Sequence, residues 1–288
     1  MAERILVLGA SGFIGTYLRA ALSRAGFQVT GTYHCHPAAG LVALDLLDAA
    51  ALRVLMAKVR PDMVVFLSGS KAVERCDQDP AYAIDLNVQT VRNYLDECAD
   101  IGLSPTTMFF STDYVFDGLR GSYRSGDPVG PRTVYGVTNL LAERLLLASG
   151  LPGVLLRVSA VMGRNGGFFQ WLARSLEGDQ PISLFDNTIF SPTSIGRLCR
   201  FVTDYADSLS KQVPANGMRV VHLSDGYRMS RYQFGCAVAA RLGRSTAILK
   251  PVQADFTAST FQADLSLIPE GLDDFLDPNG WNELEDIF

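Results

Sequence analysis

A hydroxyl-rich strand end and a tyrosine at a helix start are the groups in this sequence with the types and spacing for chemistry. The stretch FFSTDYVFDG, residues 109–118, places Ser111, Thr112 and Asp113 after an apolar run, and Tyr135 opens the helical pattern VYGVTNLLAE. A hydroxyl from Thr112 or Ser111 together with a phenol can polarise a ketone and protonate the alkoxide formed on its reduction. We therefore predict that Thr112 and Tyr135 are catalytic.

The stretch GASGFIG lies between the first apolar run and the first helical pattern. Three glycines at this spacing permit a tight turn, close approach of the backbone to a pyrophosphate, and tight packing of helix on sheet. The N-terminus of the following helix offers unpaired N–H groups and a positive dipole end to the phosphates. The sequence thus predicts a dinucleotide site. Its predicted contacts in this loop are Gly9, Ser11, Gly12, Phe13, Ile14 and Gly15.

The end of the second predicted strand bears on which dinucleotide binds. The region TGTYHCH has no carboxylate for the ribose 2′-hydroxyl of NAD and no arginine for the 2′-phosphate of NADP. Thr32, Tyr33 and His34 can hydrogen-bond either form. Asp45, in LDLLD, is either a contact of the adenine or an exposed loop acid. We favour NADP(H) over NAD(H).

The elements that must position these residues alternate strictly along the first half of the chain. Apolar runs at 4–10, 28–34, 62–69, 106–112 and 153–161 predict strands, and helical patterns at 13–26, 48–61, 79–102 and 133–149 predict helices. Such alternation implies parallel strands joined by crossover helices, an α/β doubly wound sheet of the Rossmann type. The strands are apolar throughout, which is typical of a sheet covered on both faces.

The regular alternation of strands and helices ends after Val161, where short predicted strands and helices are mixed. We expect residues 1–160 to form the dinucleotide-binding domain, with 192–224 returning to it. Residues 161–191 and 225–288 are expected to form a smaller substrate-binding lobe that ends in an acidic tail.

Composition excludes several other classes of protein. The 288 residues carry a net charge of -5 without a long basic run, which argues against a nucleic-acid partner. We find no signal peptide and no apolar run long enough to cross a membrane. The five cysteines are odd in number and far apart, as expected of free thiols in the cytoplasm. The HCHP stretch is interpreted as a loop, and no metal is predicted, because consecutive residues rarely converge on one ion.

Taken together, these motifs resemble the extended short-chain dehydrogenase/reductases. The closest resemblance is to the dTDP-4-dehydrorhamnose reductase branch, which also includes the regulatory β subunit of methionine adenosyltransferase. STDYVFDG is quite specific to this branch, DLNVQTV carries the structural asparagine of the family, here Asn87, and FSPTSIGRLC and HLSDGYRMSRYQFGCAVAARLG match later segments. The resemblance implies NAD(P)H, a nucleotide-sugar ketone, Thr112 as polarising hydroxyl and Tyr135 as proton donor.

Further site residues follow from the resemblance. It implies cofactor contacts at Leu46, Leu67, Ser68, Gly69, Lys71, Asn87, Tyr135 and Asn139, besides those given above. Substrate contacts are expected among Ser111, Asp113, Val115, Phe116, Arg157 and Trp171. For Arg157 the alternative is a surface ion pair, and for Trp171 packing in the core or between the lobes is favoured. By analogy with the fold, two chains are expected to pair through the helices that contain Asn87 and Tyr135.

Departures from the family pattern are as informative as the matches. The family has a lysine four residues after the tyrosine, which binds the nicotinamide ribose and lowers the tyrosine pKa from its usual value of about 10. Asn139 stands there and brings hydrogen bonds without charge. The late arginine that would grip a diphosphate has no counterpart in FTASTFQADLSLIPE. Lys71 either restores a positive charge near Tyr135 or is a solvated loop lysine.

Three functions are compatible with this pattern. The first is reduction of a nucleotide-linked or otherwise activated sugar ketone, with Thr112, Tyr135 and Asn139 at the centre. The second is a non-catalytic regulatory subunit that keeps the cofactor and binds a protein partner, which the missing lysine and arginine favour. The third is another reaction, an epimerisation or an elimination, on a tightly held cofactor.

Overall fold

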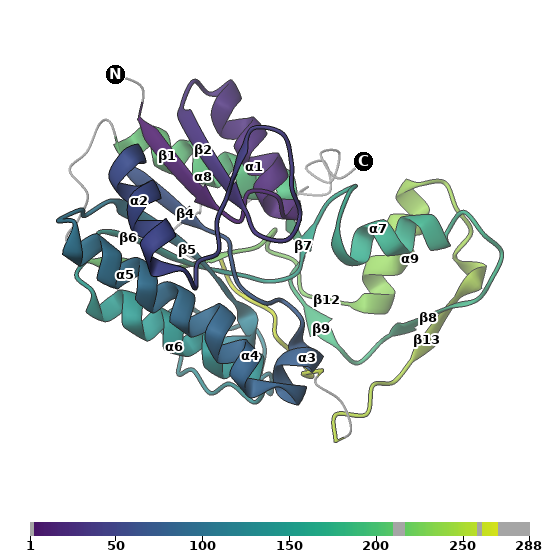
Figure 1. The fold of residues 1–288 in the computed structure, drawn as a ribbon. Helices are drawn as coiled ribbons and strands as arrows, with labels where there is room; N and C mark the ends of the chain where they lie inside the picture. The colour runs from purple at the N-terminus through teal and green to yellow at the C-terminus, as the bar shows by residue number, and fades with distance from the viewer. Residues whose placement is uncertain (1–2, 210–216, 258–260, 270–288) are drawn as a thin grey trace.

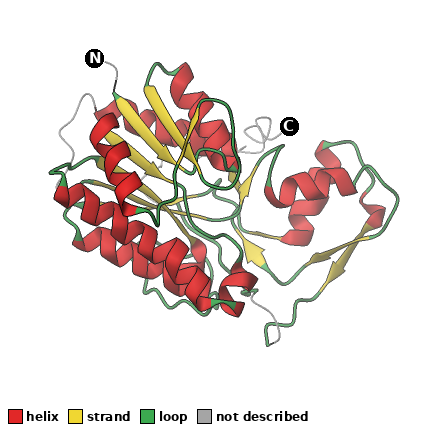
Figure 2. Ribbon diagram, viewed as in Figure 1, coloured by secondary structure: helices red, strands yellow, loops and turns green. Residues whose placement is uncertain are grey.

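A seven-stranded parallel sheet organises the chain (Figures 1 and 2). The structure is a computed structural model, and it describes residues 3–209, 217–257 and 261–269. The strand order is β11-β6-β5-β4-β1-β2-β3, and every neighbouring pair is parallel. The strands are β1 (Arg4–Leu8), β2 (Gln28–Tyr33), β3 (Leu41–Ala43), β4 (Met63–Phe66), β5 (Thr106–Thr112), β6 (Gly153–Val158) and β11 (Met218–Leu223). The predicted doubly wound α/β sheet is thereby confirmed.

Helices cover both faces of the sheet because its strands are apolar on both sides. Ile5 and Val7 of β1 pack with α1 (Phe13–Arg24) and α8 (Ile195–Leu209). The alternate residues, Leu6 and Leu8, belong to the second core cluster, which includes side chains of helices on the opposite face. Those helices are α2 (Ala49–Val59), α5 (Thr90–Asp100) and α6 (Val134–Ala148).

The long helix predicted over 79–102 is interrupted. It consists of α4 (Pro80–Ile84), a π-helical turn Asp85–Gln89, and α5. A short helix, α3 (Val73–Gln78), precedes it and was not predicted. The π turn contains Asn87, and such turns in helices are frequent at functional sites.

A smaller lobe follows the sheet and is built of short paired strands and two helices (Figure 1). Its strands are β7 (Val161–Met162), β8 (Ile182–Phe185), β9 (Ile189–Phe190), β10 (Thr193–Ser194), β12 (Met229–Ser230) and β13 (Leu249–Val252). Helices α7 (Gly167–Ser175) and α9 (Arg231–Arg241) share a core with these strands, centred on Phe169, Leu184 and Phe234. The acidic end of the chain lies outside the described residues. In the ranges that are described, every helix is too short or too polar to traverse a bilayer.

Candidate active site

The glycine loop between β1 and α1 has the geometry that its sequence predicts. Gly9 has φ +87°, and a Cβ there would lie 2.9 Å from Ser68 Oγ. A Cβ on Gly15 would lie 2.6 Å from Ala10 Cα, so this glycine lets α1 pack tightly on the strand end. Gly12 is exposed, and a Cβ there would meet only the Gly9 carbonyl oxygen at 3.4 Å. Since no side chain caps the N-terminus of α1, the loop fits a pyrophosphate.

Residues at the end of β2 that were predicted to bind the coenzyme make contacts within the protein. The hydroxyl of Thr32 is buried and accepts a hydrogen bond from the Gly9 N–H at 3.1 Å. His34 is exposed in the loop after β2, and its Nε2 lies 3.7 Å from a carboxylate oxygen of Asp45. The HCHP stretch is thus a loop, as predicted. The side chain of Leu46 is buried in the core that contains Leu52, so any contact it makes with the coenzyme is through its backbone.

Thr112 and Tyr135 meet at the carboxyl end of β5. Burial raises the pKa of the Tyr135 phenol to about 12, although the Thr112 side chain beside it acts to lower that pKa. Helix α6 approaches this strand end closely because Gly136 has no side chain: a Cβ there would lie 2.2 Å from the Tyr114 carbonyl oxygen. The structure therefore brings together the two residues predicted as catalytic.

Asn139 lies one turn after Tyr135 and is buried. Its Nδ2 donates to the Tyr135 backbone carbonyl at 2.8 Å. Asn87 is likewise engaged by the protein: its Oδ1 accepts from the Ser70 N–H at 2.7 Å, and its Nδ2 donates to Thr138 Oγ1 at 3.0 Å. Asn87 therefore joins the π turn, the loop after β4 and α6, and acts on the site by fixing the helix that carries Tyr135.

The loop after β4 contains Leu67, Ser68, Gly69 and Lys71. Gly69 has φ +147°, and a Cβ there would lie 2.9 Å from Asn87 Oδ1. Lys71 is exposed. The groups that set the pKa of Tyr135 are its burial, Thr112, Asp113 and Cys76. Lys71 is not among them, which favours the solvated loop lysine.

Asp113 is a buried carboxylate beside the catalytic hydroxyl. Burial raises its pKa to about 6, against hydrogen bonds from Ser159 and Thr112 and the charge of Arg231, which lower it. The Ser159 hydroxyl donates at 2.6 Å and the Thr112 hydroxyl at 3.1 Å. Ser159 and Arg231 were not singled out from the sequence, because the segments that carry them lie far from Asp113 along the chain.

Ser111 and Arg157, predicted as substrate contacts, belong to a buried ion pair instead. Arg157 Nη2 donates to Glu143 Oε2 at 2.7 Å and its Nε to Oε1 at 2.9 Å, and the Ser111 hydroxyl also donates to Glu143. All three side chains are buried. Arg157 therefore forms a buried ion pair with Glu143, two turns after Tyr135 on α6. It is neither at the surface nor free to bind a phosphate.

Val115 and Phe116 are a further correction. Both side chains are fully buried and pack with Tyr123, Leu265 and Leu267, so a substrate does not reach them. They are apolar and follow a strand end, and sequence alone does not distinguish a lining residue from a core residue there.

Trp171 also departs from the favoured interpretation. It is 49% exposed and stacks on Phe168 with ring centroids 5.6 Å apart. It therefore lies at the surface of α7, outside the core, where stacking on a ligand is sterically open.

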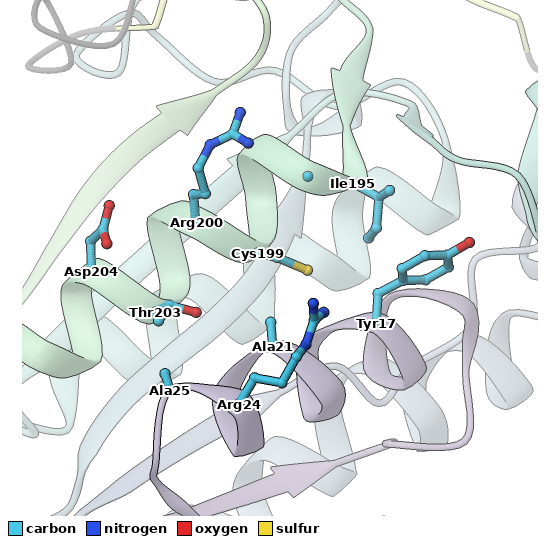
Figure 3. A pocket seen from close by; sticks show the side chains of 10 residues that line it. Tyr17, Ala21, Arg24, Ala25, Ile195, Cys199, Arg200, Thr203 and Asp204 are labelled. Atoms are coloured by element: carbon cyan, nitrogen blue, oxygen red, sulfur yellow. The ribbon is translucent and has the colours of Figure 1, made fainter. Parts of the chain in front are cut away.

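A cavity of about 550 Å³ lies on the opposite helical layer from Tyr135, between α1 and α8. Figure 3 shows Tyr17 and Arg24 of α1 facing Cys199 of α8 across it. None of the predicted site residues lines it. Among the residues described, no group of three or more His, Cys, Asp or Glu side chains could hold a metal ion.

Comparison with known proteins identifies the family. Residues 3–264 match the model of the RmlD substrate binding domain. A dTDP-4-dehydrorhamnose reductase from Streptomyces griseus is 36% identical over 211 residues, which cover 72% of this chain but less than two thirds, 64%, of that relative. The methionine adenosyltransferase 2 subunit beta of Xenopus tropicalis is 26% identical over 270 residues, which cover 90% of this chain and 78% of that relative.

A solved structure shows the same fold. The dTDP-4-dehydrorhamnose reductase from Bacillus anthracis in complex with NADP has a TM-score of 0.85 and 19% sequence identity, and the comparison covers 100% of this chain and 99% of that chain. The resemblance drawn from the motifs is thus confirmed at the level of the family. The chain belongs to the RmlD substrate binding domain family.

Proposed function

We propose that this chain is an NAD(P)H-dependent reductase of a nucleotide-linked or otherwise activated sugar ketone. The observation that carries the proposal is that Thr112 and Tyr135 lie together at the carboxyl end of β5, where the Tyr135 ring packs on Tyr114 with centroids 5.5 Å apart and the Thr112 side chain acts on the pKa of the phenol. The glycine loop follows β1 at the same edge of the sheet, where doubly wound folds bind their ligands. The reductases of S. griseus and B. anthracis named above support this choice of reaction.

The residues of this chain would supply the proton and the orientation. When bound, a nicotinamide coenzyme supplies the hydride. Tyr135 is a neutral phenol near pH 7 because burial raises its pKa to about 12. It can donate its proton to the carbonyl oxygen as the alkoxide forms, since an alkoxide is the stronger base. Packing against the ring of Tyr114 positions the phenol at the strand end, beside Thr112.

Asn139 is proposed to bind the ribose of the coenzyme. Its Nδ2 is used by the Tyr135 carbonyl, and its Oδ1 is an acceptor suited to a ribose hydroxyl. It provides no charge to stabilise a phenolate. We therefore expect reduction of the ketone to be favoured kinetically over oxidation of the alcohol, which requires Tyr135 as a base.

NADP(H) is the proposed coenzyme. No carboxylate lies on β2 to oppose a 2′-phosphate, and Asp45, in the loop that follows β3, faces the exposed ring of His34. The complex of the B. anthracis reductase with NADP supports this preference. Titration of the purified protein with NADPH and NADH by calorimetry measures it directly, and tighter binding of NADH would reverse it.

A Tyr135→Phe variant tests the reaction. Loss of the phenol proton is expected to lower the rate of NADPH oxidation by a sugar ketone by about 10²–10⁴-fold. NADPH affinity should stay within a few-fold of the parent, because the phenyl ring is kept. A full rate in the variant would remove Tyr135 from the reaction, and a parent that binds neither NADPH nor NADH would refute the proposal as a whole.

A regulatory subunit is the second candidate, and Asn139 is the observation that favours it. Within the described chain no cation acts on Tyr135, which suits a protein that holds a coenzyme without turnover. The similarity to methionine adenosyltransferase 2 subunit beta supports the same idea. Bound coenzyme whose oxidation state never changes with sugar ketones, together with a protein partner that co-purifies stoichiometrically, would select this function over the first.

A further inference from the structure

Arg231, the first residue of α9, has an unusual environment. Its guanidinium carbon lies 4.0 Å from the ring centroid of Phe190 and 4.9 Å from that of Phe168. The faces of aromatic rings attract a cation, so the two rings hold the guanidinium in place. Phe168 in turn stacks on Trp171, which is exposed. A row of aromatic rings therefore connects Arg231 to the surface of the smaller lobe.

Arg231 makes no hydrogen bond and no ion pair with any residue in 3–209, 217–257 or 261–269. Its guanidinium carries five N–H donors and a permanent charge. Partial burial lowers the pKa of Arg231, and the neighbouring Tyr114 and Asp113 act in the opposite direction. By contrast, Arg157 is buried for a structural purpose and is matched by Glu143. Arg231 is instead partly exposed, and its donors, which no described residue occupies, are free to bind a ligand.

The charge of Arg231 reaches the catalytic strand end. It acts on the pKa of both Asp113 and Tyr114 and lowers each. The Asp113 carboxylate nevertheless bonds to the hydroxyls of Ser159 and Thr112, and it forms no ion pair with Arg231. Arg231 is only partly buried, so its donors are open to a ligand that binds at this strand end.

The end of the chain and the neighbouring Arg228 supply no further free cation next to β9. The chain contains no lysine or arginine after Lys250. The C-terminal segment that pairs with β9, through Asp264 and Ile189, thus brings carboxylate and no positive charge. Arg228, near by in the sequence, is already bound to Asp264. The donors of Arg231, by contrast, have no partner among residues 3–209, 217–257 and 261–269.

We propose that Arg231 binds a phosphate of the nucleoside diphosphate carried by the substrate. The inference rests on the proposed function and deepens it by naming the group that anchors the sugar. The planar guanidinium presents two parallel N–H donors that match two phosphate oxygens. A sugar carboxylate would offer the same chemistry, and the choice of probes below separates the two.

Calorimetry on the NADPH-loaded protein provides the test, with dTDP, inorganic pyrophosphate and glucuronic acid as probes. The parent is expected to bind dTDP and pyrophosphate, and Arg231→Met to weaken both by about 10–100-fold. Arg231→Lys should lie between them, because it keeps the charge and loses the paired donors. Binding of glucuronic acid alone that depends on Arg231 would overturn the phosphate assignment, and so would a parent that binds none of the probes.

Thermal unfolding without a probe supplies a second readout. Replacing a partly buried cation that has no acceptor by methionine, which still fills the space between the rings, should leave Tm unchanged or raise it. A lower Tm together with unweakened dTDP binding would show that Arg231 is a structural partner of Asp113 and would overturn the proposal. Arg144→Met, on the exposed side of α6, is the matched control and should change neither quantity.

The failures of the two proposals are distinguishable. If the parent binds NADPH and dTDP in an Arg231-dependent way but reduces no sugar ketone, the phosphate site stands and the reductase does not. If NADPH is oxidised by a sugar ketone but dTDP binding is the same in Arg231→Met, the reductase stands and the phosphate site is refuted.

Discussion

The side-chain amide of Asn139 donates to the backbone carbonyl of Tyr135 across 2.8 Å, within one turn of α6. One end of the amide is therefore used by the helix itself, and the phenol one turn earlier receives no charge from it. The pKa of Tyr135, about 12, is the result of burial opposed only by the Thr112 side chain. A tyrosine in this state can give a proton at neutral pH but cannot readily take one.

Restoring a cation should change this balance. In Asn139→Lys the ammonium is expected to stabilise the phenolate and lower the pKa of Tyr135 from about 12. The population of phenolate near pH 7 then rises about tenfold for each unit by which the pKa falls. Oxidation of the alcohol should therefore accelerate more than reduction of the ketone, and its alkaline limb should move to lower pH. Rate profiles against pH in both directions measure the shift.

Asn139→Met is the control for this variant, because methionine has a length similar to that of lysine and no charge. Its pH profile should keep the alkaline limb of the parent. Identical profiles for the lysine and methionine variants would mean that charge at this position does not reach the phenol.

The spacing of residues along the chain predicted those parts of the molecule whose structure is set by neighbouring residues. The glycine loop, the apolar strands and the start of α6 follow from residue spacing, and the structure has them where the sequence indicates. The π turn at Asn87 was not predictable in this way, because the contacts of Asn87 are with Ser70 and Thr138, which lie elsewhere in the chain.

The same limit explains why the environments of Arg157 and Trp171 differ from those expected. Arg157 and Trp171 were judged by type: an arginine near a strand end for a phosphate, and a tryptophan among apolar neighbours for the core. The partner of Arg157 is Glu143 on another element, and Trp171 faces outward from a helix whose other side fills the core. Burial and pairing across the chain decide these roles, and single-sequence spacing does not contain them.

The buried pair of Glu143 and Arg157 should be costly to break. Glu143→Gln leaves the guanidinium without its carboxylate, and we expect a loss of about 3–5 kcal/mol in the free energy of unfolding. Arg157→Met leaves an unpaired buried carboxylate and should cost a similar amount. The double variant should lose less than the sum of the two. Urea denaturation of the four proteins gives the coupling energy, and additive losses would show that the pair contributes nothing beyond its separate side chains.

Gly136 sets the distance between α6 and the end of β5. A Cβ there would lie 2.2 Å from the Tyr114 carbonyl oxygen, so Gly136→Ala must push the helix away. Because Tyr135 moves with α6, the variant should lose most of its turnover and also lower Tm. Gly126→Ala, at a position with nothing within 4 Å, is the control and should affect neither. Unchanged kinetics in Gly136→Ala would show that the close approach of α6 is not needed for catalysis.

Asp113 should give the stability of the protein a distinctive dependence on pH. Burial raises its pKa from 3.8 to about 6, so between these values the folded protein keeps a proton that the unfolded chain releases. The contribution of Asp113 to the free energy of unfolding is therefore greatest below pH 4 and falls as the pH rises to about 6. In Asp113→Asn the fall disappears.

Relative to the parent, Asp113→Asn should gain roughly 2 kcal/mol between pH 4 and pH 7, offset by a constant loss from the altered hydrogen bonds to Ser159 and Thr112. Urea denaturation of both proteins across this range measures the difference. Asp85→Asn, at an exposed position, should show no comparable trend. A difference that stays flat, or that decreases with pH, would mean that hydrogen bonds and the charge of Arg231 outweigh burial at Asp113.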